Sequence, residues 1–275
     1  MKSSVKRLLG RGLFAAHLDA VLLRNAAVIV AFHRIQDADA SDSLSIDSAT
    51  FERHCRFYQR HFDVVPLREL VYRIAQGQSI DRHLAITFDD GYRDNFENAR
   101  PVLEKLSLPA TFFVVTEWMG SDVVPWWDQA RGVRHPWMTW DQVRALHRSG
   151  FEVGAHTRSH VDLGKASPGE ARDEVLGARQ ELERQIGVRV DSFAYPYGGR
   201  QHVTEANREV VKDAGFRCCC SAFGGINPAG ADPFRLKRVP VSHTSPHQFG
   251  FEVATGRSVL AAQHQCSETS AATGS

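Results

Sequence analysis

Short apolar runs recur along the chain and alternate with segments in which apolar residues stand three or four positions apart. Such runs are typical of buried strands, and the wider spacing is typical of helices with one apolar face. Strands are predicted over residues 26–32, 83–88, 108–115, 151–155, 192–195, 216–222 and 238–241. Helices are predicted between them over residues 48–61, 67–76, 95–106, 141–149, 168–186 and 204–214.

This alternation indicates the fold class. From residue 26 onward strands and helices follow one another without an internal repeat or a long linker. The order predicts one α/β domain whose parallel sheet closes into a barrel of about seven strands, and 275 residues are enough for such a barrel. The predicted division is an amphipathic N-terminal helix over residues 1–25, the barrel over residues 26–263 and a disordered tail over residues 264–275.

The first 25 residues combine leucines at helical spacing with basic residues, namely Lys2, Lys6, Arg7, Arg11 and Arg24. No uncharged apolar run in this segment reaches the ~20 residues of a membrane-spanning helix. No small-residue cleavage site follows a continuous apolar core, so a secretion signal is not predicted. Two interpretations stay open: the helix lies on anionic lipid, or it packs against the bottom of the barrel.

The run from Leu84 to Phe88 ends in two adjacent carboxylates, Asp89 and Asp90, which are followed by Gly91. In α/β folds the carboxyl ends of the strands carry the chemistry, and glycine permits a sharp turn that would expose both acids there. Two close carboxylates repel each other unless a proton or a cation relieves their charge. The pair therefore suggests an acid–base dyad or a metal site, although Asp-Gly is also a common solvated turn.

A second strand-like run, over residues 151–155, leads into His156-Thr157-Arg158-Ser159-His160. Histidines four residues apart can share one face of a helical turn and bind one ion. One carboxylate and two histidines leave coordination positions open for water and substrate, as a hydrolytic metal requires. The chain has 13 histidines, so such a pair also arises by chance, but its combination with two acids at another strand end is much less expected.

Three motifs together resemble one known family. They are Thr87-Phe88-Asp89-Asp90-Gly91-Tyr92, the segment from His156 to His160, and Phe193-Ala194-Tyr195-Pro196-Tyr197-Gly198. In type and order they are similar to the motifs of polysaccharide deacetylases with the NodB homology domain (carbohydrate esterase family 4), over roughly residues 26–245. The resemblance implies a deformed (β/α)7 barrel and a hydrolase that removes an N-acetyl group from an amino sugar.

The resemblance also implies roles for individual residues. Asp90, His156 and His160 would hold a divalent metal ion, with zinc as the expected ion, and Asp89 would be the general base. A backbone N–H near Tyr197 would donate a hydrogen bond to the oxyanion. The expected products are acetate and a free amine on the sugar.

Two positions depart from the family pattern. Many members carry an arginine that steadies the base where this chain has Ala194, and we expect Arg238 to replace it. The late Leu-x-His motif, which carries the general acid, is matched only weakly by Val241-Ser242-His243.

We expect His33 to be the general acid instead of His243. His33 ends the first predicted strand, and the first and last strands of a barrel are neighbours. Ala31-Phe32-His33-Arg34 also resembles a strand-end motif of some extracellular-matrix polysaccharide deacetylases. The alternative is a histidine that is only hydrogen-bonded at the end of a strand.

All five tryptophans lie between residues 117 and 140, in a loop between a predicted strand and a predicted helix. Such aromatic side chains suit the apolar faces of sugar rings, or they form a hydrophobic cover on the barrel.

Five cysteines include three in a row, Cys218-Cys219-Cys220. Adjacent side chains of a strand point to opposite faces, so the three do not converge on one ion. We interpret them as small apolar residues of a buried strand rather than as a redox centre. This interpretation favours a reducing compartment, and we expect a cytoplasmic protein with a peripheral contact at the inner face of the membrane through the N-terminal helix.

Lys and Arg number 33 against 32 for Asp and Glu, and the net charge of +1 gives no field suited to nucleic acid. The expected partner is an N-acylated carbohydrate. Alternatives are an N-formyl sugar deformylase of the same mechanism, a catalytically inactive sugar-binding module and a 2-His-1-carboxylate iron enzyme. Asp89, which no ligand role requires, speaks against the last two.

Overall fold

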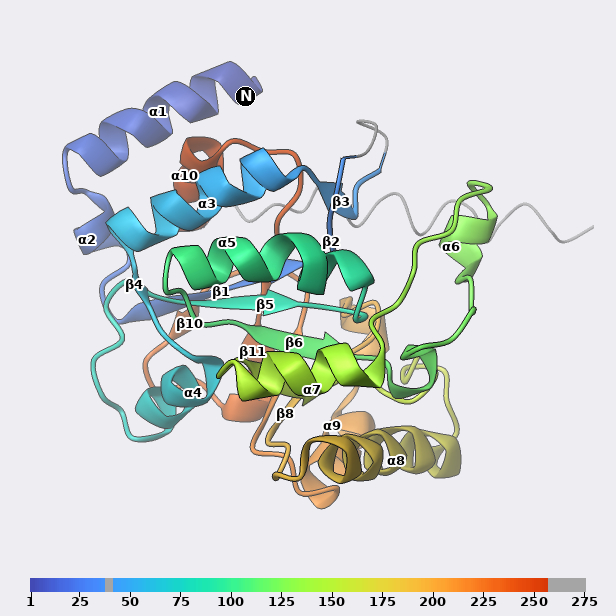
Figure 1. Cartoon of the computed structure of the whole chain (residues 1–275). Coiled ribbons are helices and arrows are strands. Elements are labelled where there is room, and N and C mark those ends of the chain that lie inside the picture. Colours follow the sequence, from blue (N-terminus) through green and yellow to red (C-terminus); the bar gives the residue numbers. More distant parts are fainter. Residues whose placement is uncertain (38–41, 257–275) are drawn as a thin grey trace, which may run out of the picture.

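A mostly parallel sheet, in which only β10 is antiparallel to its neighbour among the described strands, curls into a nearly closed barrel at the centre of the molecule (Figure 1). The computed structural model describes residues 1–37 and 42–256. Hydrogen-bonded neighbours follow the order β10-β1-β5-β6-β7-β8-β9-β11, with β12 on β1 and β4 on β5, and the predicted deformed α/β barrel is confirmed. The strands are β1 (Ala26–Phe32), β2 (Arg34–Ile35), β3 (Ser45–Ile46), β4 (Asp63–Val64), β5 (His83–Phe88), β6 (Thr111–Val114), β7 (Glu152–Ala155), β8 (Ser192–Ala194), β9 (Cys218–Ser221), β10 (Asn227–Pro228), β11 (Leu236–Lys237) and β12 (Val239–Pro240).

The barrel closes through one short segment, residues 236–240. β11 runs parallel to β9, with Leu236 opposite Cys220, and β12 runs parallel to β1, with Val239 opposite Val30. Only Arg238 separates the two pairings. The predicted last strand over residues 238–241 therefore begins earlier and is divided, because this segment leaves one edge of the sheet to join the other.

Several helices begin at residues that the sequence marks as caps. Asp47 accepts a hydrogen bond from the Thr50 N–H at 2.8 Å, and Thr139 and Ser167 each begin a capping box. The α-helices are α1 (Ser3–Ala15), α2 (Asp19–Leu22), α3 (Ser48–His61), α4 (Leu67–Ala75), α5 (Arg100–Lys105), α6 (Trp126–Gln129), α7 (Trp140–Arg148), α8 (Pro168–Ile186), α9 (Glu205–Asp213) and α10 (Pro246–Ala254).

The segment after the acid pair is not one uniform helix, although the sequence predicts a kinked helix over residues 95–106. A π-helix, Asn95–Ala99, leads directly into α5. Pro101 lacks the N–H that would bond the Glu97 carbonyl in an α-helix, so the wider turn lies just before it. The π-helix places the side-chain amides of Asn95 and Asn98 against the backbone that follows β1.

Two further elements differ from the prediction. β6 begins at Thr111 rather than at residue 108, because Pro109 has no N–H to give to a neighbouring strand. α10 was not predicted, and its residues from Gln248 to Ala254 are all buried. A helix that is covered on several sides lacks the one-sided apolar spacing that marks a surface helix.

The N-terminal segment forms α1 and α2 instead of one helix over residues 1–25. Gly10 in α1 lies against the backbone of His247 in α10, and Phe14 meets Phe57 of α3 at 4.9 Å between ring centroids. The expected disordered tail, residues 264–275, lies outside the described residues. Within residues 1–37 and 42–256, every helix is too short or too polar to cross a membrane.

Cys218, Cys219 and Cys220 form most of β9 and are all buried. Burial raises the pKa of Cys220 to about 12, so this thiol stays protonated near neutral pH. The interpretation of these residues as small apolar residues of a buried strand is confirmed.

The buried His54 of α3 leads to a prediction about pH and stability. Burial lowers the pKa of His54 from 6.5 to about 4, although Nε2 faces the Thr244 carbonyl at 2.8 Å. The unfolded chain therefore binds a proton here at a higher pH than the folded chain. As the pH falls from 6.5 to about 4, the free energy of unfolding should decrease by up to about 3 kcal/mol through this group.

Urea unfolding of the wild type and of His54→Gln at about pH 7.5 and about pH 4.5 measures this contribution. The glutamine amide can still donate to the Thr244 carbonyl but does not titrate. The variant should therefore lose less stability than the wild type between the two pH values. An equal loss in both proteins would contradict the prediction.

Candidate active site

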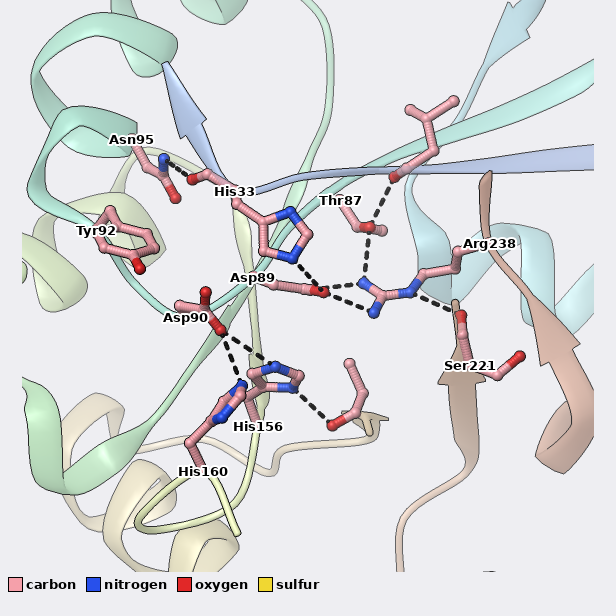
Figure 2. A network of polar contacts seen from close by, with 12 residues as sticks. His33, Thr87, Asp89, Asp90, Tyr92, Asn95, His156, His160, Ser221 and Arg238 are labelled. Atoms are coloured by element: carbon pink, nitrogen blue, oxygen red, sulfur yellow. Dashed lines mark hydrogen bonds and ion pairs between the residues drawn. The ribbon is translucent and has the colours of Figure 1, made fainter. Parts of the chain in front are cut away.

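The acid pair follows β5 at a point where the backbone turns sharply. The Asp89 N–H bonds the Phe32 carbonyl at 2.9 Å, whereas Asp90 has a left-handed φ of +71°. Gly91 follows with φ +90°, and a Cβ there would meet the Met119 side chain at 2.5 Å, so this position requires glycine. The turn directs the two adjacent carboxylates to different partners (Figure 2).

Asp89 is held by Arg238. Nη1 and Nη2 donate to its two oxygens at 2.6 and 2.7 Å, and both side chains are buried. Arg238 also donates to Thr87 Oγ1 at 3.1 Å and to the Ser221 carbonyl at 3.2 Å. Burial by itself would raise the pKa of Asp89, but Arg238 and then His156 bring that pKa below its usual value. Asp89 is therefore ionised and fixed in direction.

Asp90 faces the two histidines. The Nε2 atoms of His156 and His160 each lie 3.3 Å from its Oδ1. His156 Nδ1 donates to the Ala194 carbonyl at 2.8 Å, which leaves a lone pair on Nε2 directed at Asp90. Both histidines lie in an irregular loop after β7, so the predicted helical turn is wrong. Left-handed φ values of +63° at Thr157 and at His160 curve this loop and bring the rings together.

The chemistry of this group fits a divalent cation. The ligand atoms of Asp90, His156 and His160 lie within 4.8 Å of one another, and all three side chains are buried. Zinc ligands at ~2.1 Å in a tetrahedron stand about 3.4 Å apart, which agrees with the two 3.3 Å separations.

The protonation of the group also fits a cation. Burial lowers the pKa of His160 despite the nearby carboxylate. The pKa of Asp90 lies well below its usual value, against the effect of burial, because two imidazoles face it. Asp90 Oδ1 accepts no hydrogen bond from the described residues. Asp90 Oδ1 and the lone pair of His156 Nε2 face the same point, and a positive ion there would give both a partner.

His33 directly follows β1 and lies beside the acids (Figure 2). Its Nε2 is 4.0 Å from Asp89 Oδ2, and its side chain is 25% exposed, so it can meet a substrate. The side-chain amide of buried Asn95 donates to the His33 carbonyl at 2.7 Å and fixes its backbone. His243 is exposed and contacts the Asp42 carbonyl at 3.1 Å through Nε2. The structure thus places His33 beside the acid pair and gives His243 a different partner.

A buried ion network holds the backbone next to His33. Arg34 is fully buried and donates to Asp128 at 2.9 Å and to Asp42 at 3.2 Å. Its guanidinium also lies over the Tyr92 ring, 5.0 Å from the centroid. Because Asp128 belongs to α6, the network ties the tryptophan-rich segment to the end of β1.

Aromatic rings surround His160. Trp118 stacks on it at 5.1 Å between centroids, and Trp127 and Tyr197 meet it at 5.2 and 4.8 Å. Trp118 is buried, so the expected hydrophobic cover is confirmed for this ring. Trp126, which contacts Trp127, is 46% exposed and Tyr197 is 39% exposed. Contact with the faces of sugar rings stays a prediction for Trp126.

No role was predicted from the sequence for three supporting residues: Thr87, Asn95 and Arg34. Thr87 Oγ1 donates to the Val30 carbonyl at 2.7 Å and orients Arg238. The role of Arg34 could have been found from the sequence, because this cation directly follows a buried strand and a buried cation needs anionic partners. Asn95 gave no signal, since its bond to His33 joins residues that are distant in the sequence.

Comparison with known proteins agrees with this geometry. The family profile described as polysaccharide deacetylase matches residues 76–219, which is 144 of the 275 residues. The chain is 23% identical over 241 residues to the poly-β-1,6-N-acetyl-D-glucosamine N-deacetylase of Staphylococcus aureus. This alignment covers 79% of each of the two chains.

Two solved structures share the fold. IcaB from Ammonifex degensii superimposes with a TM-score of 0.70 at 23% identity, over 82% of this chain and 96% of that chain. The deacetylase PplD of Streptococcus pyogenes superimposes with a TM-score of 0.69 at 19% identity, over the same shares. The family match spans more than half of the chain and includes the acid pair, both histidines and the Tyr197 turn. The chain therefore belongs to the polysaccharide deacetylase family and is a hydrolase of that family.

Proposed function

We propose that this protein removes N-acetyl groups from an amino sugar of a polysaccharide or glycan precursor by metal-dependent hydrolysis. One observation carries the proposal: Asp89 is held by Arg238 beside the group of Asp90, His156 and His160. Three ligands alone would suit metal binding, whereas a second, fixed carboxylate supplies a base. The relative from Staphylococcus aureus is named for poly-β-1,6-N-acetyl-D-glucosamine, so this polymer is the first substrate to test.

The residues divide the chemistry of amide hydrolysis. Asp90, His156 and His160 would hold a divalent ion, with zinc expected from the ligand types, whose positive charge would lower the pKa of water and polarise the amide carbonyl. Asp89 accepts a proton from the water as its oxygen attacks the carbonyl carbon. Arg238 keeps that carboxylate ionised and oriented, so Asp89 acts without first rotating.

The leaving nitrogen also needs a proton before the C–N bond breaks. His33 is partly exposed beside Asp89, and an imidazole is suited to donate that proton near neutral pH. A backbone N–H in the turn at Tyr197, which has φ +61°, donates to the oxygen that gains negative charge. The place of the Tyr197 ring beside His160 supports this assignment. The products are acetate and a free amine.

Amine release from a panel of N-acetylated and N-formylated glycans and glycolipids, with and without added zinc, tests the proposal. We expect zinc-stimulated release from N-acetylated substrates. Release from N-formylated substrates alone would establish the deformylase alternative. Sugar binding without any release would indicate an inactive module, and iron-dependent oxygen consumption would indicate an oxygenase.

We predict that His156→Ala loses bound metal and activity together, because the variant removes one of three ligands. Metal content after dialysis and the rate of amine release measure both effects. His147→Ala, which changes a histidine of α7, is the matched control and should keep both. Full metal occupancy in His156→Ala would refute the ligand assignment.

The two adjacent acids should respond differently to the same change. Asp89→Asn should keep the metal and lower turnover by ~10²–10⁴-fold, the usual contribution of a general base. Asp90→Asn should lose the metal. Metal content therefore discriminates between them, and equal metal loss in both variants would show that the roles are shared or exchanged.

We predict that His33→Ala abolishes the basic limb of the pH–rate profile while the metal stays bound. In the wild type the rate falls at high pH because the proton donor of the leaving amine is lost, whereas the variant lacks this donor at every pH. His243→Ala should keep the limb, because His243 bonds the Asp42 carbonyl. The opposite result, with the limb lost only in His243→Ala, would assign the general acid to His243.

A further inference from the structure

We propose that α1 and α2 carry a surface that binds anionic lipid bilayers. We call it the lipid-binding surface and define it by its exposed apolar residues Val5, Leu8, Leu9, Leu18, Val21 and Leu22 and its basic residues Lys2, Arg7, Arg11 and Arg24. In Figure 1, α1 lies at the side of the barrel away from α6, which borders the candidate active site. A glycan could therefore reach the site while this surface is on a membrane.

Exposed apolar side chains are concentrated in this part of the molecule. Of the 12 large hydrophobic residues that are exposed in the described chain, seven lie within residues 1–22. Leu8 is 69% exposed and Val21 is 72% exposed. Single exposed apolar residues are normal on any protein, but such a concentration is typical of a surface that binds a membrane or a protein partner.

The other face of α1 already has its partner. Gly10, Leu13 and Phe14 are buried, and the backbone of His247 lies so close to Gly10 that any side chain there would overlap it. Lys6 is paired with Glu252 of α10 at 2.6 Å. α1 is therefore held in one orientation, and its outer face is not needed for contact with α10.

The outer face of α1 has the pattern of an interfacial helix. An α-helix turns about 100° per residue, so Val5, Leu8 and Leu9 form one strip roughly opposite the buried face. Arg7 and Arg11 stand one turn apart along one flank of this strip. This is the arrangement in which apolar side chains enter the acyl boundary while basic side chains reach lipid phosphates.

Charge also favours an anionic partner. Residues 1–25 contain five basic residues and one acidic residue, a net charge of +4, whereas the whole chain has a net charge of +1. The remaining residues thus have a net charge of −3. The single acid, Asp19, is buried and lies 3.6 Å from Arg82, so it does not offset the exposed cations.

A second copy of the chain fits this surface less well. Two copies joined through α1 would bring Arg7 and Arg11 of one copy toward the same basic residues of the other. Like charges at an interface oppose association. An anionic bilayer suits both the apolar strip and its basic flank, and we therefore propose lipid as the partner.

Co-sedimentation of the full chain with vesicles tests the proposal. Vesicles of phosphatidylcholine with phosphatidylglycerol should bind the protein, and vesicles of phosphatidylcholine alone should bind it much more weakly. Binding should weaken as the salt concentration rises, because ions screen exposed charges. Light scattering without lipid gives the oligomeric state.

Two outward-facing double variants separate the apolar and the electrostatic contributions. L8E/L9E should reduce binding at least about 100-fold, because two leucines no longer enter the bilayer. R7Q/R11Q should reduce binding roughly 30-fold, because each cation near an anionic surface contributes about a five- to sixfold gain in binding. The matched control is R148Q/R172Q, which removes two exposed arginines from α7 and α8 and should bind like the wild type.

Activity and fold of the α1 variants serve as controls, and several binding results would refute the proposal. Circular dichroism and amine release from a soluble substrate should be unchanged in both α1 variants, which shows that the fold is intact. Three results would overturn the proposal: equal binding to both vesicle types, no binding to either type, or a loss of binding in the R148Q/R172Q control that equals the loss in R7Q/R11Q. A dimer without lipid that becomes a monomer in L8E/L9E would overturn it as well and would assign the surface to a second copy.

Discussion

The buried ion pair between Asp89 and Arg238 is the interaction on which the rest of the site depends. It exists because residues 236–240 pair with β9 at one end and with β1 at the other. Arg238 lies between these pairings, next to the carboxyl end of β5. Removing one partner of a buried pair leaves an uncompensated charge and typically costs about 3–5 kcal/mol. Closure of the barrel and orientation of the base are therefore one structural requirement.

The acids can stand next to each other because the backbone separates their side chains. Asp90, Thr157, His160 and Tyr197 all have left-handed φ values between +61° and +71°. Residues other than glycine adopt this backbone conformation only at a free-energy cost of order 1 kcal/mol or more for each residue. Their concentration around one group of ligands shows that the surrounding fold maintains a geometry that local preferences would not select.

The segment that closes the barrel also connects the site to the N-terminal helices. β12 is followed in the chain by α10, and α10 carries α1 through Gly10, Phe14 and the pair between Lys6 and Glu252. One stretch of chain thus positions the guanidinium beside the base and supports the helix that carries the proposed lipid-binding surface. α1 lies away from α6, which borders the candidate site (Figure 1), so substitutions on the outer face of α1 can be tested without change at the acids.

The sequence by itself determined the parallel α/β barrel, many helix starts and the group of ligand-type residues. These features are local: apolar runs give strands, as for Ala26–Phe32, and short-range bonds such as that of Asp47 give helix starts. The acid pair and the two histidines were visible because polar residues followed buried strands. Arg238 and His33 were also named, from the resemblance and from the neighbouring first and last strands of a barrel.

Only the tertiary structure decided how these residues meet. It replaced the expected helical turn at His156 and His160 with a loop, divided the last strand around Arg238 and brought Asn95 to the His33 carbonyl. It also revealed α10, whose buried faces leave no one-sided pattern. These features depend on bonds and packing between residues that are far apart in the chain. Local spacing cannot encode them, because the same residue types would satisfy several local conformations equally well.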